Sequence, residues 1–521
     1  MIKLQLLCEE VLDRTTQPRD YHEVAAIIES LGWTDAMVAE EFGYEDVFEL
    51  ARAVFDRLPR IDSQLVVPTD KRSMWTSIAA FIRSFFRGIM FAMPIAVSIF
   101  AMLTVRYSLW AYQYFSVHLA TSIAIGTAMS FVATGGFTQA LARRGLMYVV
   151  QQEYGLARRL SYRVVFVGLI SVLVLGAASV LFNWLFSVLP WSMAWVTFVY
   201  YVFLSVIWLS IAVLYMLHRE LLFTIVMSAG IALVIFLHEQ VRLSIVVAQV
   251  IGLTATSVVS LMLAAYLLYS AELRREEPEE RVALPRASIV IYTSAPYFAY
   301  GLLYFSFLYL DRFISWSANS AYMPFVVWFR GQYEIGLDWA MLALVLPMGV
   351  VESALTRFMD NLVPNQKRLL YSDTERFGTL CARAYIKQLA LYTGVSLLSA
   401  MLVSELVRLL EKQVTFEVYL SASHVSMFVF RLSLFAYVLL GAGLFNVLIF
   451  FCLSRPEMAL RAVASAIAVD FVVGFVLSRW LGYEWAAAGL LAGSVVFFVA
   501  GSIQVLKVMH NMDYHYYYAS S

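Results

Sequence analysis

The side chains best suited to binding a substrate are concentrated in one stretch, SAPYFAYGLLYFSFLYLDRFISWS. Tyr297, Tyr300 and Tyr304 recur at helical spacing, and Asp311 lies close to the same face about four turns from Tyr297. A tyrosine ring offers a flat apolar face and a hydroxyl at its rim, which suits stacking on sugars. Two interpretations stay open. The stripe could contact a substrate, with Arg312 touching that substrate or a neighbouring helix, or it could be packing that ends in a structural ion pair.

A second polar stretch follows, RGQYEIGLDWAMLALVLPMGVVE. Arg330, Glu334 and Asp338 step by four and share a helical face, and Glu352 returns near that face fourteen residues after Asp338. A stripe of carboxylates on a membrane helix must face a wet cavity or partner side chains. Glu334 and Asp338 could also be ordinary residues at a helix end, and Glu352 could reach cytosolic water.

Two further charges, Arg431 and Asp470, sit in apolar surroundings. A structural ion pair between them is the first interpretation. A role in lining a cavity or coupling to protons is the second, because a carboxylate in apolar surroundings can exchange a proton near neutral pH.

Sequence motifs of enzymes are absent. The chain has no histidine-rich metal cluster, no HExxH, no glycine-rich phosphate loop with a lysine, and no GxSxG. We therefore expect no enzymatic activity, no cofactor and no metal. Without a nucleotide-binding domain, the energy for any transport must come from an ion gradient, from synthesis of the substrate, or from a partner. No basic tract suggests nucleic acid.

The elements that position these residues are about twelve apolar runs of membrane-spanning length. The 521 residues are 61% hydrophobic and 14% charged. Water could not solvate the surface of a soluble protein with this composition. The runs are continuous rather than alternating, which indicates helices and not a barrel. We therefore predict an all-α polytopic protein of the lipid bilayer. The expected spans are 84–105, 116–139, 162–186, 194–217, 221–237, 244–271, 288–310, 337–359, 386–407, 422–451, 462–481 and 485–507.

These spans divide into two sets of six, which predicts two helical bundles. Pro94 and Pro296 fall at nearly matching depth in the first helix of each set and should bend those helices. Interrupted helices at corresponding positions in two repeats point to the moving parts of a transporter, although prolines are common in membrane helices. The predicted division is an N-terminal extension, a first bundle, a linker, a second bundle and a tail, at 1–70, 84–271, 272–287, 288–507 and 508–521.

Residues 1–70 read as a small helical unit outside the membrane. Asp20 and Glu23 have capping-box spacing, Gly32 ends the helix they begin, and Thr34 can cap the next one. Gly43 then separates a further helix, and two prolines mark a connection to the membrane part. Such a unit is more often a docking module than a catalytic one.

Orientation follows from the distribution of positive charge. Basic residues gather in every second loop and before the first span, so both termini should be cytosolic. The N-terminus is charged and polar, unlike a cleavable signal peptide. Cys8, Cys381 and Cys452 fall at or near the cytosol, which does not indicate a disulfide framework. The basic residues that carry this argument are Arg143, Arg144, Arg158, Arg159, Arg274, Arg275, Arg281, Arg286, Lys367, Arg368, Arg376, Arg383, Arg455 and Arg461.

Two segments resemble the signature region of the Pel exopolysaccharide transporter family: YGLLYFSFLYLDRFISWS and GQYEIGLDWAMLALVLPMGVVE. This family is part of the superfamily of multidrug, oligosaccharidyl-lipid and polysaccharide exporters. The resemblance covers 84–507 and is sharpest at DRFISWS and YEIGLDW. It implies a pair of bundles with a central cavity in a bacterial cell membrane, moving a hexosamine-rich polymer outward. The implied partners are a cytosolic glycosyltransferase and other membrane subunits of a synthase complex.

Three other functions stay open. A lipid-linked oligosaccharide flippase would need a basic cavity, for which Arg431 is the main candidate. A membrane scaffold could hold a glycosyltransferase without transporting anything. A drug or cation antiporter would couple through Asp311 or Asp470.

Overall fold

The structure is a computed structural model. It describes residues 2–14, 18, 20–58, 74–273, 284–318, 323–366, 374–411 and 424–512. The chain divides into two compact units. The first comprises Met1–Phe81, Ala354–Gln388 and Leu506–Ser521, and the second comprises Ile82–Ser353 and Leu389–Val505.

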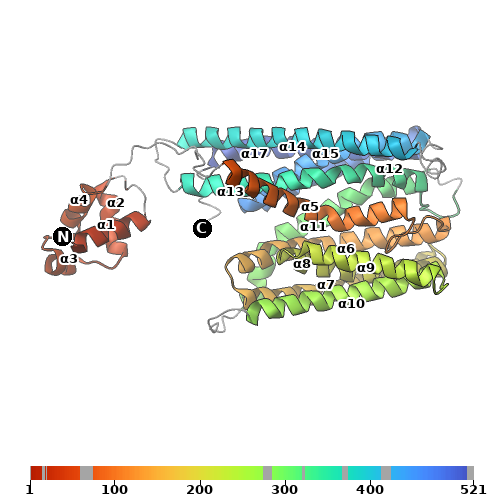
Figure 1. Ribbon diagram of the computed structural model, residues 1–521, viewed down its shortest axis with the longest axis horizontal. Helices are drawn as coiled ribbons and strands as arrows, with labels where there is room; N and C mark the ends of the chain where they lie inside the picture. Colours follow the sequence, from red (N-terminus) through yellow and green to blue (C-terminus); the bar gives the residue numbers. More distant parts are fainter. Residues whose placement is uncertain are drawn as a thin grey trace. The chain divides into compact units, whose positions relative to one another are not determined.

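The N-terminal part of the first unit is a set of four short helices, coloured red in Figure 1. They are α1 (Ile2–Arg14), α2 (Tyr21–Ser30), α3 (Asp35–Phe42) and α4 (Val47–Phe55). They enclose their own core, in which Val11, Val24 and Leu50 are among the fully buried side chains. This part of the chain therefore has the helical character that the sequence predicts.

The ends of these short helices follow the sequence signals. The Asp20 carboxylate accepts a hydrogen bond from the Glu23 amide at 2.9 Å, as the capping-box spacing predicts. Gly32 and Gly43 adopt φ of 92° and 76°, in the left-handed region that glycine reaches without strain. Thr34 occupies the N-cap of α3 but makes no side-chain capping bond. The predicted connection through the two prolines lies outside the described residues.

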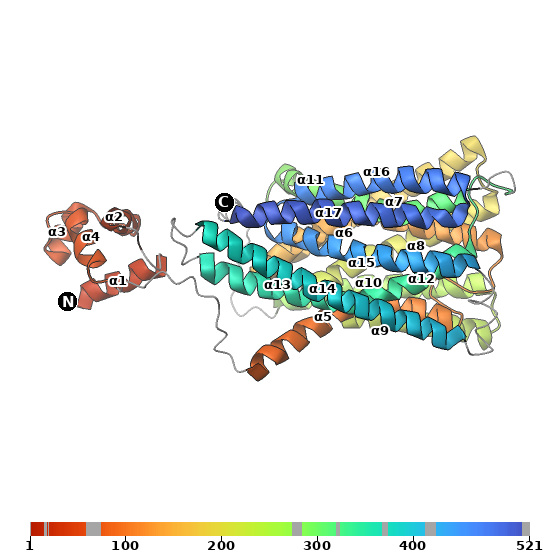
Figure 2. The same cartoon turned by 90° about the horizontal axis from the view of Figure 1, so that it is seen from above.

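The second unit consists of long helices that lie side by side (Figures 1 and 2). We call α5 to α10 the first bundle and α11 to α17 the second bundle; parts of α5, α13, α14 and α17 belong to the first unit. In the first bundle the bounds are α5 (Met74–Thr104), α6 (Val117–Val150), α7 (Tyr154–Phe186), α8 (Trp191–Met216), α9 (Glu220–Glu239) and α10 (Ile245–Leu273).

The second bundle has the same number of long helical spans. Its elements are α11 (Ala287–Trp316), α12 (Gly331–Met341), η2 (Leu342–Leu344), α13 (Val345–Gln366), α14 (Thr374–Glu411), α15 (His424–Cys452), α16 (Pro456–Trp480), η4 (Tyr483–Trp485) and α17 (Ala486–His510). The 3₁₀ turn η2 joins α12 and α13 into one span. The described part of the chain is thus all-α, with twelve long spans in two bundles, as predicted.

Two ends of the bundles are distinguished by connectivity. The loop end is where α5 ends and α6 begins, and the linker end is where α10 ends and α11 begins. Successive helices run alternately between these two ends.

Eleven of the described helical spans are long and apolar enough to cross a membrane. The twelfth long helix, α11, has 30 residues and does not reach that apolarity. It carries five tyrosines, the proline Pro296 and the adjacent charges Asp311 and Arg312. The long helix that falls short of membrane-spanning apolarity is therefore the one that holds most of the candidate substrate contacts.

Several predicted spans are too short. The sequence predicts a long loop after 116–139, but α6 continues to Val150 and α7 begins at Tyr154. The third, eighth and ninth spans also begin earlier than predicted, at Tyr154, Gly331 and Thr374. Charged side chains marked the predicted ends, whereas a helix keeps its hydrogen bonds after it leaves the apolar layer. Pro94 and Pro296 both lie inside helices, α5 and α11, as expected.

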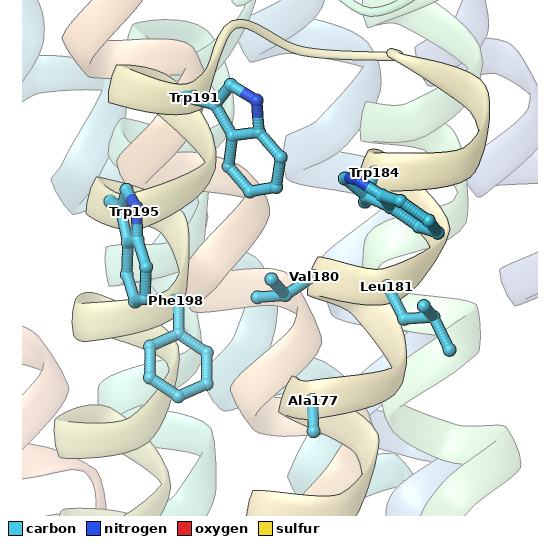
Figure 3. Close-up of a pocket in the computed structure, with 7 residues that line it drawn as sticks. All are labelled: Ala177, Val180, Leu181, Trp184, Trp191, Trp195 and Phe198. Carbon is cyan, nitrogen blue, oxygen red and sulfur yellow. The ribbon is translucent and has the colours of Figure 1, made fainter.

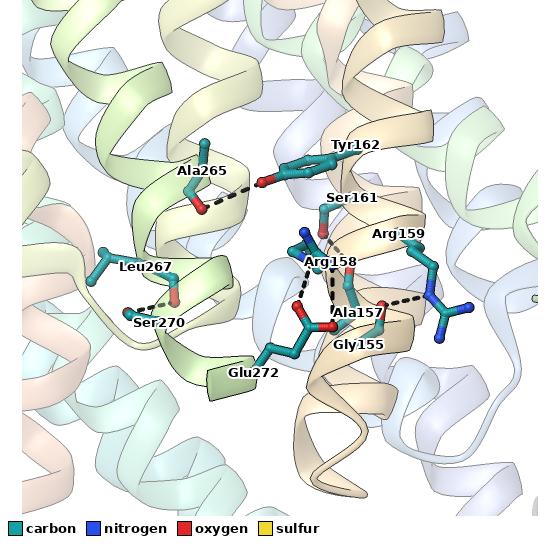
Figure 4. A network of polar contacts seen from close by, with 10 residues as sticks. All are labelled: Gly155, Ala157, Arg158, Arg159, Ser161, Tyr162, Ala265, Leu267, Ser270 and Glu272. Carbon is teal, nitrogen blue, oxygen red and sulfur yellow. Dashed lines mark hydrogen bonds and ion pairs between the residues drawn. The ribbon is translucent and has the colours of Figure 1, made fainter. Parts of the chain in front are cut away.

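One ion pair ties α7 to α10 near the linker end of the first bundle (Figure 4). Arg158 Nε lies 2.6 Å from one oxygen of Glu272, and its Nη2 donates to the other oxygen at 3.2 Å. The guanidinium also lies over the rings of Tyr162 and Tyr269. Two contacts from one guanidinium hold the orientation of both side chains, so this pair ties α10 to α7.

Candidate functional site

A buried cluster of charges lies where α11 packs on α12, toward the loop end. Arg312 Nε donates to one oxygen of Glu334 at 2.9 Å, and the indole N–H of Trp316 donates to the other oxygen at 2.9 Å. A second nitrogen of Arg312 donates to the Leu308 carbonyl at 2.9 Å. Glu334 is therefore fully engaged, and Arg312 pairs with the neighbouring helix, one of the two roles expected for it.

Asp311 is completely buried beside this pair. Its Oδ2 accepts a hydrogen bond from the Tyr333 hydroxyl at 2.7 Å. Its Oδ1 has no hydrogen-bond partner among the described residues. Asp338 lies one turn beyond Glu334 on α12 and is half-buried. The shared face that the sequence predicts for α12 thus lies against α11.

Asp470 of α16 is also completely buried, and neither of its oxygens has a hydrogen-bond partner in the part of the chain that the structure describes. Two glycines of α17 form the wall beside it. A Cβ on Gly489 would lie 2.6 Å from the Asp470 carboxylate, and a Cβ on Gly493 would lie 2.9 Å from the Asp470 Cβ. The helix opposite therefore approaches closely but offers no side chain to pair with the acid.

The predicted ion pair between Arg431 and Asp470 is wrong. Arg431 is exposed on α15, and the described residues contain no ion pair between the two. Instead, α16, which carries Asp470, packs on α11, which carries Asp311. The helical faces of α15 and α16 could not be oriented relative to each other from the sequence.

Glu352 lies apart from these acids. Its carboxylate is 3.9 Å from Arg87 Nη1 of α5, and both side chains are partly exposed. The pair joins the first bundle to the second. Glu352 therefore does not continue the acidic stripe of α12.

A row of aromatic rings crosses from one bundle to the other. In the second bundle, Tyr297 and Tyr300 both contact the ring of Phe451, with centroids 5.0 and 5.1 Å apart. Tyr300 stacks on Tyr304 at 5.7 Å, and Tyr304 contacts Phe305 at 5.5 Å. The predicted tyrosine stripe is thus a continuous run of ring contacts.

This run continues into the first bundle through Phe131 of α6. Phe131 stacks on Phe305 at 5.4 Å and on Trp208 of α8 at 4.2 Å. Trp208 meets Trp110, from the loop between α5 and α6, at 5.7 Å. We call the eight connected rings the aromatic ladder: Trp110, Trp208, Phe131, Phe305, Tyr304, Tyr300, Phe451 and Tyr297.

Arg143 of α6 lies beside the last ring of the ladder, Tyr297, toward the linker end. Its guanidinium lies 5.7 Å from the centroid of the Tyr297 ring, and its Nη2 donates to the Ser454 hydroxyl at 2.7 Å. Tyr297 and Ser454 belong to the second bundle, so this arginine bridges the two bundles beside the last ring.

Glycines allow the two bundles to approach at backbone distance. A Cβ on Gly301 of α11 would overlap the Gly135 carbonyl of α6. At the second crossing, a Cβ on Gly349 of α13 would lie 2.7 Å from the Phe85 carbonyl, and a Cβ on Gly88 of α5 would lie 2.7 Å from the Gly349 Cα. We call the interface between the two bundles the seam. The ladder thus crosses the seam, where two glycine contacts bring the backbones of the bundles together.

A surface groove between α7 and α8 is a separate feature (Figure 3). It has a volume of about 440 Å³ and is lined by Ala177, Val180, Leu181, Trp184, Trp191, Trp195 and Phe198. Its tryptophans are among the exposed large side chains, and it offers almost no polar group. Such a groove suits the acyl chains of the bilayer better than a sugar, so we assign it to the lipid-facing surface.

Sequence analysis missed most of the first-bundle residues of this site. Phe131, Trp208 and Arg143 do not stand out because aromatic rings are frequent in the whole chain and the arginine was assigned to a loop. The tyrosines of α11 were found because their hydroxyls are unusual in an apolar span.

The fold of this chain is similar to that of several solved transporter structures. A Vibrio cholerae MATE transporter, VcmN, superposes with a TM-score of 0.56 at 14% identity, over 84% of this chain and 98% of its own. The fold is that of the MATE transporters. A MATE crystal structure in the bent conformation gives a TM-score of 0.55 at 12% identity, covering 84% and 96% of the two chains.

A transporter of the MOP superfamily from Pyrococcus furiosus gives a TM-score of 0.55 at 13% identity, over 82% and 96% of the two chains. No protein-family model and no curated protein matches the chain. At these identities the comparison establishes a multi-pass membrane protein with the MATE fold. The resemblance to the Pel family therefore stays a hypothesis.

Proposed function

We propose that this protein carries a polysaccharide from the cytosol across the bacterial cell membrane, along the seam between its two bundles. The aromatic ladder is the observation that carries this proposal. Sugar rings stack on aromatic faces through their C–H bonds, and a row of such faces lets a polymer move without one tight binding site. An aromatic row that crosses both bundles is more than either bundle needs for its own packing.

The polar groups beside the ladder suit the same ligand. The hydroxyl of Tyr300 is buried without a hydrogen-bond partner among the described residues. Such a group normally costs free energy unless something bonds it, and a sugar hydroxyl would do so. The Pel-like, hexosamine-rich polymer implied by the sequence resemblance carries hydroxyls and amides in this way.

Positive charge supports the direction of transport. Arg143, Arg144, Arg158 and Arg159 all lie toward the linker end, which we infer to be cytosolic. Both termini would then be cytosolic and the loop end would face the periplasm. The polymer would enter beside Arg143 and Tyr297 and leave at the loop end.

The proposed partners are a cytosolic glycosyltransferase and other membrane subunits of the synthase complex. The α1–α4 unit has its own core, as a docking module should. Polymer synthesis would supply the driving force if the partners feed the chain directly into the seam.

A lipid-linked oligosaccharide flippase is less well supported. It needs free cations for the pyrophosphate, but Arg431 is exposed and Arg312 is held by Glu334. The ladder, rather than a basic cavity, dominates the seam.

The test is polysaccharide secretion by cells carrying Phe131→Leu or Tyr304→Leu. Each variant keeps apolar volume but removes one ring, so secretion should fall roughly tenfold per ring if stacking contributes about 1.4 kcal/mol. Phe475→Leu is the matched control, because Phe475 stacks on Phe471 on the exposed face of α16, away from the ladder.

Membrane abundance of every variant is measured alongside. Equal secretion by ladder and control variants at equal abundance would refute the path. Deletion of residues 1–58 tests the remaining alternative, a membrane scaffold that holds a glycosyltransferase without transporting anything. Lost secretion after that deletion, with every ladder variant still active, would indicate a scaffold.

A second candidate function, cation-coupled antiport, is favoured by the acids Asp311 and Asp470. Three of their four oxygens lack partners among the described residues, so a bound proton or sodium ion would satisfy groups that the protein leaves unbonded. Asp470→Asn should then abolish substrate-driven proton or sodium flux in proteoliposomes. Unchanged flux in this variant, or no flux in the unaltered protein, would remove this candidate.

A further inference from the structure

The connection between α5 and α6 is a re-entrant loop, Val105 to Phe115. Its tip residue Leu109 is completely buried and fits against two glycines, Gly230 of α9 and Gly252 of α10. Those glycines lie nine and seven residues from the loop ends of their helices. At 1.5 Å per residue, the Leu109 side chain at the tip reaches about 10 to 13 Å below the helix ends.

Irregular backbone at such depth needs internal hydrogen-bond partners, because lipid supplies none. Gln249 of α10 provides them. Its side-chain nitrogen donates to the carbonyls of Ser108 and Ala111 at 3.3 and 3.1 Å, and its oxygen accepts from the Tyr200 hydroxyl at 2.6 Å. Gln249 is completely buried, so this amide works as a latch for the loop.

Two other side-chain contacts hold the same loop. The hydroxyls of Ser108 and of Ser98 on α5 are 2.6 Å apart, and the Tyr107 hydroxyl donates to Glu239 at the end of α9. Within the loop, the Ser108 amide donates to the Ala111 carbonyl at 2.8 Å, and Tyr107 and Tyr112 form an isolated bridge. The tip is therefore a self-contained turn that side chains attach to the bundle.

The loop also carries the terminal ring of the ladder. Trp110 contacts Trp208, whose indole N–H is fixed by the Ser130 hydroxyl at 3.0 Å. Trp208 is thus anchored to the bundle, while Trp110 is attached to the turn. Withdrawal of the loop would separate these two rings and uncover the face of Trp208.

We propose that the 105–115 loop is a latched lid at the loop end of the path, with Trp110 as a sugar-stacking subsite and Gln249 as its latch. This inference rests on the proposed polysaccharide path. The lid opens when a sugar displaces Trp110 from Trp208, and the latch returns it. A polymer then leaves only while the lid is displaced. When no polymer is present, the latch keeps the lid in place and limits leakage of small solutes through the path.

The first experiment is a tether. Ser98→Cys with Ser108→Cys, in a chain with Cys8, Cys381 and Cys452 replaced by serine, places two thiols where hydroxyls now lie 2.6 Å apart, near disulfide distance. Oxidation should stop secretion, and a reductant should restore it. The controls are the two single-cysteine variants under the same oxidant, which cannot form the cross-link and should continue to secrete. Secretion that continues with the loop fully cross-linked would overturn the lid.

The second experiment needs no polysaccharide. Leu109→Cys in the same cysteine-free chain reports exposure of the tip to a water-soluble maleimide. Adding Gln249→Leu removes three hydrogen bonds and should raise the labelling rate at least about tenfold, the change expected from the net loss of even one of them. Thr254→Val, which removes a hydroxyl bonded only within α10, is the control and should leave labelling unchanged.

These readouts separate failure of the lid from failure of the path. Slow labelling in every variant would show a fixed plug and overturn the proposal. Faster labelling with Gln249→Leu, combined with normal secretion by the Phe131 and Tyr304 variants, would support a moving loop and refute the polysaccharide path.

Discussion

Gly135 of α6 and Gly301 of α11 bring the backbones of the two bundles into direct contact. A Cβ added at Gly301 would overlap the carbonyl oxygen of Gly135, and this atom cannot rotate away. The contact lies beside Phe305 and Phe131, where the aromatic ladder crosses the seam. The separation of the bundles at this depth is therefore set by two residues without side chains.

Gly301→Ala should destabilise the protein by about 1–3 kcal/mol, the usual cost of overpacking. Gly394→Ala is the matched control, since a Cβ at that position of α14 would meet nothing within 4 Å. It should be neutral or stabilising because alanine favours helix. Thermal unfolding in detergent measures both. Equal melting temperatures would show that the seam accommodates a methyl group.

The pair of Arg158 and Glu272 should contribute about 1 kcal/mol of coupling in a double-mutant cycle with glutamine at either position. Both side chains are only 28% exposed, and Arg158 contacts both oxygens of Glu272. The pair of Arg408 and Glu405 is 68% and 61% exposed and serves as the comparison, with coupling near zero. The same coupling for both pairs would contradict the structural distinction drawn here.

Asp470→Leu should leave stability unchanged or raise it, because no described residue bonds the carboxylate that is removed. Asp311→Leu should instead cost about 1–3 kcal/mol, since it leaves the buried Tyr333 hydroxyl without its acceptor. Melting temperatures of the two variants give the test. A large loss for Asp470→Leu would reveal a structural role for that acid.

The Cys8 thiol of α1 should react slowly with iodoacetamide at pH 8. Burial raises the pKa of this thiol above its usual value, with the nearby Arg57 opposing that shift, so less of the reactive thiolate is present. Since the folded pKa is the higher one, the associated stability is complete below about pH 8.5 and is lost as the pH rises through the raised value.

The test uses a chain in which Cys381 and Cys452 are replaced by serine. Its alkylation rate is measured for the native protein and in urea. The ratio of the native rate to the urea rate should increase as the pH rises. A native rate equal to the urea rate at pH 8 would show that the core of the α1–α4 unit does not cover Cys8.

Much of the fold was predictable because it depends on local signals. Runs of apolar residues predicted twelve spans, and the spacing of Asp20 and Glu23 predicted the start of α2. Helix ends were predicted poorly. Arg143 ended a predicted span, although its helix continues and its guanidinium reaches the other bundle.

The site was predictable only within single helices. Helical spacing put Tyr300 next to Tyr304 and Asp311 on a polar face, but no spacing rule relates α15 to α16, so Asp470 was assigned the wrong partner. Gln249 was overlooked for a related reason. One amide in an apolar span is visible in the sequence, but the loop carbonyls that it bonds lie about 140 residues earlier in the chain.

The limited apolarity of α11 has a consequence for how the protein is made. Nascent helices enter lipid from the translocon according to their own hydrophobicity, and a span with five tyrosines and adjacent charges partitions poorly by itself. Its contacts with Gly135 and Phe131 belong to a helix synthesised about 170 residues earlier. Biogenesis of the second half should therefore depend on the finished first half, which acts as the surface that draws α11 out of the translocon.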